Sequence, residues 1–311
     1  MTGILYAVPN LLGAVPPENV LPQRTLDVAR SLRHWIVETP KPARAFLKSL
    51  ETGSAIATLD IQSLPDSAVV CNCFGHEQAI AEYVMAALLQ RHVPLADADR
   101  RLREGDWAYW AGSPDRIHDE LAGKTIGCLG FGHIGKAIAA RAKAFEMQVH
   151  VANRSPVATS AIVDRSYALN ELQDFWGSAD FIVVSVPLTA ETAGIVGAAA
   201  FAAMRPTAVV INVGRGPTID ERAMYDALVQ GRIGGAIIDT WYAYPSPGKA
   251  NVLPSALPFH TLPNVVMTPH MSGWTSGTIR RRQQTMADNI KCRLAGRACV
   301  NVVRPALADS R

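Results

Sequence analysis

The chain has 311 residues, of which 49% are hydrophobic and 18% charged, and a formal net charge of +3 at pH 7. This composition is typical of a globular protein with a large core, and the length predicts two domains. The scattered positive charge argues against nucleic-acid binding, no apolar stretch reaches membrane-spanning length, and no signal peptide is visible. The five cysteines have no metal-binding spacing, so we expect reduced thiols, no metal and a cytoplasmic location.

The predicted elements alternate between helices and strands along most of the chain. A long helix is expected at 76–92, because its apolar residues recur at helical spacing. Farther along, short runs rich in Val and Ile lack polar alternation, as expected for parallel strands that are covered on both faces. The succession predicts an α/β fold with a doubly wound parallel sheet. Strands are expected at about 125–130, 148–153, 180–187, 208–214, 235–241 and 264–270, and helices at about 133–146, 169–178, 197–204, 219–230 and 275–295.

A glycine-rich turn joins the first of these strands to its helix. It reads Gly130-Phe131-Gly132-His133-Ile134-Gly135. In this context the first glycine permits the turn, the second lets the backbone approach a pyrophosphate, and the third lets the helix pack on the strand. The start of the helix offers free N–H groups to the phosphates. The sequence therefore predicts a dinucleotide-binding Rossmann domain.

The end of the second strand favours one cofactor over another. An acidic residue at this place normally binds the ribose of NAD, but here the strand ends in Asn153-Arg154-Ser155. An arginine can pair with a 2′-phosphate, with the two short side chains as flanking hydrogen-bonding groups. We therefore expect NADP to be preferred, with NAD as the alternative.

Two later strand ends carry polar side chains suited to redox chemistry. Arg215 lies between two glycines after the strand at 208–214, and His270 ends the strand at 264–270, shortly before Gly273. Ligands of open α/β sheets bind at the carboxyl ends of the strands. An arginine there can bind a carboxylate and polarise a carbonyl, and a histidine can exchange a proton near neutral pH.

Several ordered motifs resemble the D-isomer-specific 2-hydroxyacid dehydrogenases over about residues 65–305. The resemblance implies two Rossmann-like domains, a homodimer, and hydride transfer between a nicotinamide and a 2-keto or 2-hydroxy acid. It lies in GCLGFGHIG, VPLTAET (186–192), INVGRGPTIDERAMYDAL, the DTW at 239–241, MTPHMSG, and CNCFGHEQAIAEYVMAALL followed by LREGDW (102–107).

The resemblance also implies roles for individual residues. Arg215 would bind and polarise the keto acid, His270 would be the acid/base, and Asp239 would contact the nicotinamide carboxamide. In this family the region around His76 faces the substrate cleft, so His76 would contact the substrate; a capping or surface role is the alternative. The remaining cofactor contacts are expected from Gly130, Gly132, His133, Ile134, Gly135, Asn153, Arg154, Ser155, Val186, Pro187, Thr192, Val213, Gly214 and Gly273.

One position departs from the family pattern in the catalytic set. The family usually has a glutamate five residues after the Asp of this strand, and Tyr244 stands there. A phenol carries no charge near pH 7, so His270 should be less basic than in a Glu-paired relative. The formate dehydrogenase branch also lacks this glutamate, which keeps a formate-dehydrogenase-like activity open. We expect Tyr244 to orient His270.

The N-terminal segment departs further. Residues 3–13 and 34–50 look like the start of a tetrapyrrole-methylase-type methyltransferase, although later segments of such an enzyme do not follow. Residues 53–60 could be a degenerate form of the family's carboxylate-binding loop. The other interpretation is a recombined N-terminus joined near 58–68.

These observations predict an NADP(H)-dependent reductase of small 2-keto acids, of the glyoxylate/hydroxypyruvate reductase type. A catalytically impaired NADP-binding protein is the alternative. We expect a dinucleotide-binding domain at 76–273 and a smaller α/β substrate domain from both chain ends, 1–75 and 274–311. The basic run Arg280–Arg282 is expected to be a solvated helix face.

Overall fold

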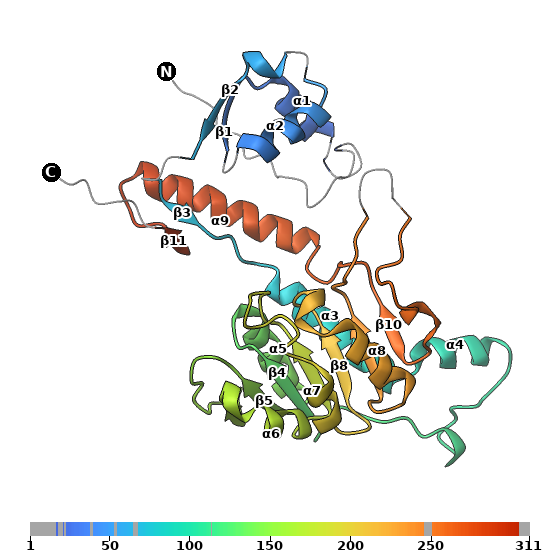
Figure 1. The fold of residues 1–311 in the computed structure, drawn as a ribbon. Helices are drawn as coiled ribbons and strands as arrows, with labels where there is room; N and C mark the ends of the chain where they lie inside the picture. The colour runs from blue at the N-terminus through green and yellow to red at the C-terminus, as the bar shows by residue number, and fades with distance from the viewer. Residues whose placement is uncertain are drawn as a thin grey trace. The chain divides into compact units, whose positions relative to one another are not determined.

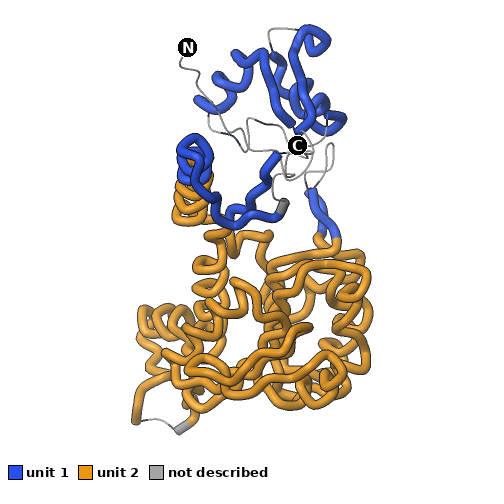
Figure 2. Tube along the Cα trace, turned by 90° about the vertical axis from the view of Figure 1, so that its left-hand side faces the viewer, with its two compact units in different colours: residues 1–73, 243–253, 288–311 blue, residues 74–242, 254–287 orange. Residues whose placement is uncertain are grey.

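The computed structural model describes residues 17, 21, 23–37, 40–52, 55–64, 68–112, 114–245 and 251–304. They form two compact units (Figure 2). The first unit comprises residues 1–73, 243–253 and 288–311, and the second comprises residues 74–242 and 254–287.

The second unit is built on a seven-stranded sheet in which every strand pair is parallel (Figure 1). The strand order is β10-β9-β8-β7-β4-β5-β6, so the chain winds outward in both directions from β4. The central strands are fully buried runs such as FIVV and VVIN, as expected for strands covered on both faces. The predicted doubly wound sheet is confirmed. Its strands are β4 (Thr125–Leu129), β5 (Gln148–Ala152), β6 (Arg165–Tyr167), β7 (Phe181–Val184), β8 (Val209–Asn212), β9 (Gly235–Ile238) and β10 (Val265–Met267).

Helices cover both faces of this sheet. The core on one face contains α3 (Glu77–His92) and α5 (His133–Ala144). The core on the other face contains α6 (Leu172–Gly177), α7 (Ala198–Ala203) and α8 (Glu221–Val229). Neighbouring residues of one strand enter opposite cores, so each strand contributes to both layers.

Local signals set the ends of α8. The Asp220 side chain accepts a hydrogen bond from the Ala223 N–H at 2.7 Å, so Asp220 is the N-cap. After the helix, Gly231 adopts a φ of 62°, a conformation that ends helices and favours glycine.

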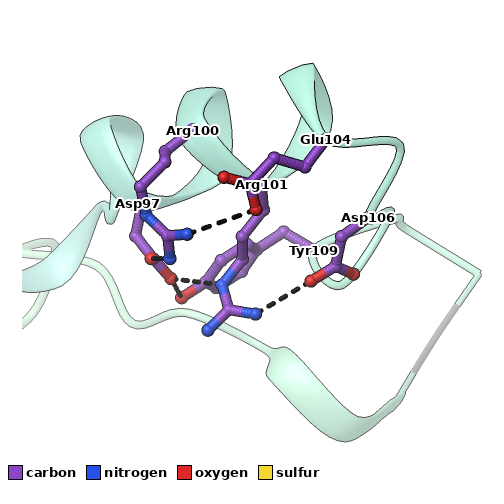
Figure 3. Close-up of polar contacts among 6 residues, drawn as sticks. All are labelled: Asp97, Arg100, Arg101, Glu104, Asp106 and Tyr109. Carbon is purple, nitrogen blue, oxygen red and sulfur yellow. Dashed lines mark hydrogen bonds and ion pairs between the residues drawn. The ribbon is translucent and has the colours of Figure 1, made fainter.

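The segment between α3 and β4, residues 93–112 and 114–124, is called the arm here. It contains a short helix, α4 (Leu95–Arg103), that the sequence did not predict. A network of charges holds it (Figure 3). Asp97 accepts hydrogen bonds from Arg100, Arg101 and Tyr109, and Arg101 also binds Asp106 at 2.8 Å.

Within the described part of the chain, no helix combines the length and the apolar character that crossing a membrane requires.

The first unit contains two small sheets. Strands β1 (His34–Val37) and β2 (Asp60–Ser63) are parallel, with α2 (Pro40–Ser49) between them in the chain. Helix α1 (Gln23–Ser31) supplies Leu26 and Ala29 to a small core, and α2 and the residue that follows it supply Leu47 and Leu50. Strand β3 (Val70–Cys71) pairs antiparallel with β11 (Val302–Arg304).

The structure bears on only part of the unusual N-terminus. Residues 3–13, which carry part of the methyltransferase resemblance, lie outside the described residues. Residues 56–58 form a 3₁₀ turn in front of β2. Whether 53–60 serve as a carboxylate loop stays a prediction, and so does a junction near 58–68.

Candidate active site

The glycine turn between β4 and α5 has the geometry that dinucleotide binding requires. Gly130 has a φ of 94°, which side chains disfavour, and a Cβ on Gly135 would collide with the carbonyl oxygen of Gly130. A Cβ on Gly132, in contrast, would meet no atom within 4 Å. The first and third glycines are thus required by the fold, and the second leaves open space in front of the helix.

The start of α5 fits the phosphates of a dinucleotide. Its N-cap is Gly132, which has no side chain to accept hydrogen bonds from the first N–H groups. The first helical residue, His133, stacks its ring on that of Phe74 at 4.0 Å, and Ile134 packs against the core. The N–H groups and the positive end of the helix dipole therefore remain for an anion.

The residues that follow β5 fit a phosphorylated ribose. The Asn153 side chain accepts a hydrogen bond from the Phe131 N–H at 3.1 Å and donates one to the Ser155 carbonyl at 2.9 Å. These bonds tie the end of β5 to the glycine turn, while Arg154 is exposed. The pKa of the exposed Glu191 carboxyl is lowered, mainly by its hydrogen bond to Thr189, and the positive charge of Arg154 contributes.

The loop after β7 borders the same turn. A Cβ on Gly130 would lie 2.9 Å from Val186 Cγ1, so Val186 packs against the first glycine of the glycine turn. The Thr192 hydroxyl closes the loop by donating a hydrogen bond to the Pro187 carbonyl at 2.6 Å. Of the predicted cofactor residues, Val186 thus lies beside the glycine turn, and Thr192 binds Pro187 in the same loop.

Arg215 is presented on a rigid loop after β8. The Asn212 side chain accepts a bond from the Gly214 N–H and donates one to the Arg215 carbonyl, both at 3.1 Å. Gly214 and Gly216 are buried, and a Cβ on Gly216 would collide with the Trp241 carbonyl. Arg215 itself is exposed, and its side chain donates to the Gly214 carbonyl at 2.7 Å. Val213, the predicted nicotinamide contact, is buried at the end of β8.

His270 lies on a turn that a buried carboxylate holds together. Asp239, which is fully buried after β9, accepts hydrogen bonds from the Met271 N–H at 2.9 Å and the Ser272 N–H at 3.0 Å. It also accepts one from the Thr268 hydroxyl at 2.5 Å, and the Tyr83 hydroxyl lies 2.8 Å from the same Thr268 oxygen. Between these contacts His270 adopts a φ of 58°. The predicted contact of Asp239 with the nicotinamide stays a prediction; its carboxylate already binds three groups of the turn.

The burial of His270 favours its neutral form. Burial lowers the pKa of His270, the Asp239 carboxylate raises it, and the Arg215 guanidinium lowers it, with a net decrease from 6.5. Arg215 follows β8 and His270 follows β10, the two strands that flank β9 in the parallel sheet. The structure thus places the two residues that the sequence predicted for carbonyl activation and proton transfer at the same edge of this sheet.

One prediction about the basic run at the start of α9 (Ser276–Leu294) was wrong in part. Arg280 is exposed as expected, but Arg281 and Arg282 are half-buried and bind the turn in front of α3. The Arg281 side chain donates to the Gly75 carbonyl at 2.8 Å, and Arg282 Nη2 lies 3.1 Å from His76 Nδ1. Their role depends on a contact between segments about two hundred residues apart, which local charge patterning does not reveal.

Of the remaining predicted residues, Gly273 and His76 belong to the second unit and Tyr244 to the first. A Cβ on Gly273 would lie 3.4 Å from His76 Cβ, so the segment around His76 borders the turn that carries His270. Tyr244 belongs to the first unit, and its action on His270 stays a prediction. Sequence reasoning missed Tyr83 and Arg282; no local signal distinguishes these residues from ordinary helix residues.

The sequence is similar to a known family of dehydrogenases and to several of its members. A model of the NAD binding domain of D-isomer specific 2-hydroxyacid dehydrogenases matches residues 85–272. Glyoxylate/hydroxypyruvate reductase B of Pectobacterium atrosepticum is 34% identical over 230 residues, covering 73% of this chain and 69% of the relative.

Solved structures extend the similarity. A D-isomer specific 2-hydroxyacid dehydrogenase from Xanthobacter autotrophicus Py2, in complex with NADPH and MES, is 30% identical with a TM-score of 0.62, covering 77% of this chain and 93% of that one. The NADPH-dependent glyoxylate/hydroxypyruvate reductase of Sinorhizobium meliloti is 27% identical with a TM-score of 0.55, covering 67% and 98%.

Proposed function

The chain belongs to the D-isomer specific 2-hydroxyacid dehydrogenase family, and we propose that it reduces small 2-keto acids such as glyoxylate and hydroxypyruvate with NADPH. The observation that carries the proposal is the pairing of Arg215 with His270. One is a cation after β8 and the other an acid/base after β10, at the carboxyl ends of the two strands that flank β9 in the parallel sheet. Relatives that are about one third identical are named as reductases of these two acids.

Arg215 is suited to bind the substrate and stabilise negative charge on its keto oxygen. Its backbone is held by Asn212 and by the Thr218 hydroxyl, which donates to the Arg215 carbonyl at 2.6 Å. Within the described residues the guanidinium forms no ion pair, so its charge is available for an anion. A cation that is fixed beforehand stabilises developing charge without reorganisation.

His270 is suited to donate the proton that converts the developing alkoxide into a hydroxyl. Its turn is held by three hydrogen bonds to Asp239, so the backbone that carries the imidazole is fixed. When bound, the nicotinamide cofactor supplies the hydride that the keto carbon accepts. The residues of the chain then have three tasks: to hold the acid, to polarise its carbonyl and to deliver the proton.

The preference for NADPH rests on the end of β5. Arg154 is exposed beside Ser155, and no acidic residue ends the strand where one would bind an unphosphorylated ribose. Arginine pairs well with phosphate because its planar fork donates two parallel hydrogen bonds. NAD remains a second cofactor of lower affinity in this proposal.

We also propose that the protein is a homodimer in the cytoplasm. The arm that contains α4 exposes large apolar side chains, among them Leu95 at 74%, Trp107 at 66% and Trp110 at 61%. An apolar surface of this kind is typical of an interface between subunits. The five cysteines are free thiols, which fits a reducing compartment. Light scattering of the purified protein would test the dimer.

The proposed activity can be tested through its product. The purified protein is incubated with NADPH and hydroxypyruvate, and the product is separated on a chiral column. We expect D-glycerate in amounts equal to the NADPH consumed. Binding of NADPH without any product would favour the alternative of a catalytically impaired cofactor-binding protein. Reduction of NADP⁺ by formate would favour the formate-dehydrogenase-like alternative.

A further inference from the structure

The turn in front of α3 is held by hydrogen bonds to two side chains, those of Glu77 and Arg281. Gly75 adopts a φ of 119°, its N–H donates to the Glu77 carboxylate at 2.7 Å, and its carbonyl accepts from Arg281 at 2.8 Å. A Cβ on Gly75 would lie 2.9 Å from Arg281 Cβ, so helix α9 packs directly against this turn. The backbone around His76 is therefore fixed.

This segment runs from the glycine turn to the turn that carries His270. At one end, the Phe74 ring stacks on His133 at the start of α5. Two residues later, His76 lies against Gly273, three residues beyond His270. All of these residues belong to the second unit. His76 thus stands beside the predicted catalytic residues, whatever the first unit contributes.

The contact with Arg282 defines the tautomer of His76. A guanidinium can only donate hydrogen bonds, so His76 Nδ1, at 3.1 Å from Arg282 Nη2, must be the acceptor. The proton of the neutral ring then lies on Nε2. Within the described residues, Nε2 has no hydrogen-bond partner, and the side chain remains 27% exposed. His76 therefore presents an unused N–H donor.

The groups that surround His76 keep it neutral. Burial and the positive charge of Arg282 on α9 lower its pKa, Glu77 on α3 raises it, and Arg215 after β8 and His133 on α5 lower it further. The net decrease means that the ring carries no charge at pH 7. The unused Nε2–H then remains a neutral hydrogen-bond donor on the segment that borders the turn of His270.

We propose that Arg282 is a positioning residue that fixes His76 as a neutral Nε2–H donor for the substrate carboxylate. The inference rests on the proposed function, because a 2-keto acid offers one acceptor group beyond the keto oxygen that Arg215 and His270 serve. A carboxylate accepts hydrogen bonds through both oxygens, so it can bind His76 and Arg215 together. The second unit then has a carboxylate anchor of its own, independent of residues 53–60.

Substitutions can separate positioning from general stability. Arg282→Met removes the contact to Nδ1, and Arg280→Met is the matched control, because it removes the same charge from an exposed site on the same helix. We expect Arg282→Met to raise the KM for glyoxylate about tenfold or more with a smaller change in kcat, as for a lost hydrogen bond to a charged group. Arg282→Lys should recover part of the loss, and Arg280→Met should match the wild type.

A second pair of variants tests the atom that acts on the substrate. The amide of His76→Gln can place a donor near the position of Nε2, whereas that of His76→Asn reaches only the position of Nδ1. His76→Gln should therefore keep a lower KM than His76→Asn. Equal losses in the two variants would contradict the proposal, and this comparison holds even if Arg282→Met does not fold.

Two readouts do not depend on turnover. Long-range ¹H–¹⁵N spectra of the ¹⁵N-histidine protein, assigned with His76→Gln, should show the Nε2–H tautomer in the wild type and its loss in Arg282→Met. Calorimetry with oxamate and NADPH should show weaker oxamate binding in Arg282→Met only. If glyoxylate is not reduced but both results hold, the proposed function fails and the anchor stands. An unchanged tautomer or unchanged oxamate affinity in Arg282→Met would overturn the anchor.

Discussion

The fully buried carboxylate of Asp239 holds the turn on which His270 adopts its left-handed backbone conformation. Both of its oxygens bind backbone N–H groups that directly follow His270, at 2.9 and 3.0 Å. A residue with a φ of 58° keeps that conformation only when its surroundings enforce it. Asp239 therefore fixes the backbone that carries the imidazole, and we expect it to act on the reaction through this position.

Asp239→Asn should separate this positioning from overall folding. An amide has one oxygen, so its NH₂ group would face an N–H donor of the turn that now binds a carboxylate. We expect unfolding in urea to show a loss of about 2 kcal/mol, as for a buried hydrogen bond to a charged group, together with a large decrease in kcat. Asp220→Asn is the control, because asparagine is an equally good N-cap for α8. Wild-type kcat in Asp239→Asn would contradict the role.

The pH dependence of the reaction should follow His270. Burial lowers the pKa of this residue below 6.5, with Asp239 opposing the decrease and Arg215 adding to it. Keto acid reduction needs the protonated ring, so kcat/KM for glyoxylate should fall as the pH rises through this lowered pKa. Oxidation of glycolate needs the neutral ring and should rise over the same range. Initial rates of both reactions between about pH 5 and 8 would test these two pH profiles. If the rates of glyoxylate reduction and glycolate oxidation changed with pH in the same direction, the assignment would be contradicted.

Substitution by alanine should affect a different property at each of two glycines of the glycine turn, Gly135 and Gly132. A Cβ on Gly135 would collide with the Gly130 carbonyl, so Gly135→Ala should destabilise the free protein by about 1–3 kcal/mol. A Cβ on Gly132 meets open space, so Gly132→Ala should leave the melting temperature unchanged and weaken NADPH binding. Thermal melts and fluorescence titrations would measure both. Unaltered NADPH affinity in Gly132→Ala would contradict a phosphate at this place.

Arg154 should determine the choice between the two cofactors. Arg154→Ala is expected to raise the Kd for NADPH about tenfold or more and to leave that for NADH nearly unchanged, because only NADPH carries the 2′-phosphate. Arg165→Ala is the control, since Arg165 is an exposed arginine at the start of the neighbouring strand β6, the end opposite to Arg154. Equal changes for both cofactors would mean that Arg154 does not contact the phosphate.

The sequence predicted the parts of the molecule that depend on neighbouring residues. The glycine turn at 130–135 and the buried strands are local signals, because turn conformation and burial on both faces act within a few residues. The same holds for Arg215 and His270, which are placed by the ends of predicted strands. Strand β6 was missed because it has only three residues, and helix α4 because it is short and contains no buried residue.

Contacts between distant segments could not be predicted in this way. The run Arg280–Arg282 has the composition of a solvated helix face, and only the folded chain shows that Arg282 meets His76. The three bonds of Asp239 likewise join the end of β9 to the turn after β10, about thirty residues later. Their partners are mainly backbone groups, which have no sequence signature.

The reductase reaction itself is the most direct test of this account. Oxidation of NADPH is followed at about 340 nm with glyoxylate as substrate, for the wild type and for Arg215→Ala. We expect saturable turnover in the wild type and a decrease in kcat/KM of about a hundredfold or more in Arg215→Ala, with NADPH binding retained. An exposed control, Arg222→Ala on α8, should behave as the wild type. A folded wild type that binds NADPH but does not oxidise it with glyoxylate, hydroxypyruvate or pyruvate would contradict the account.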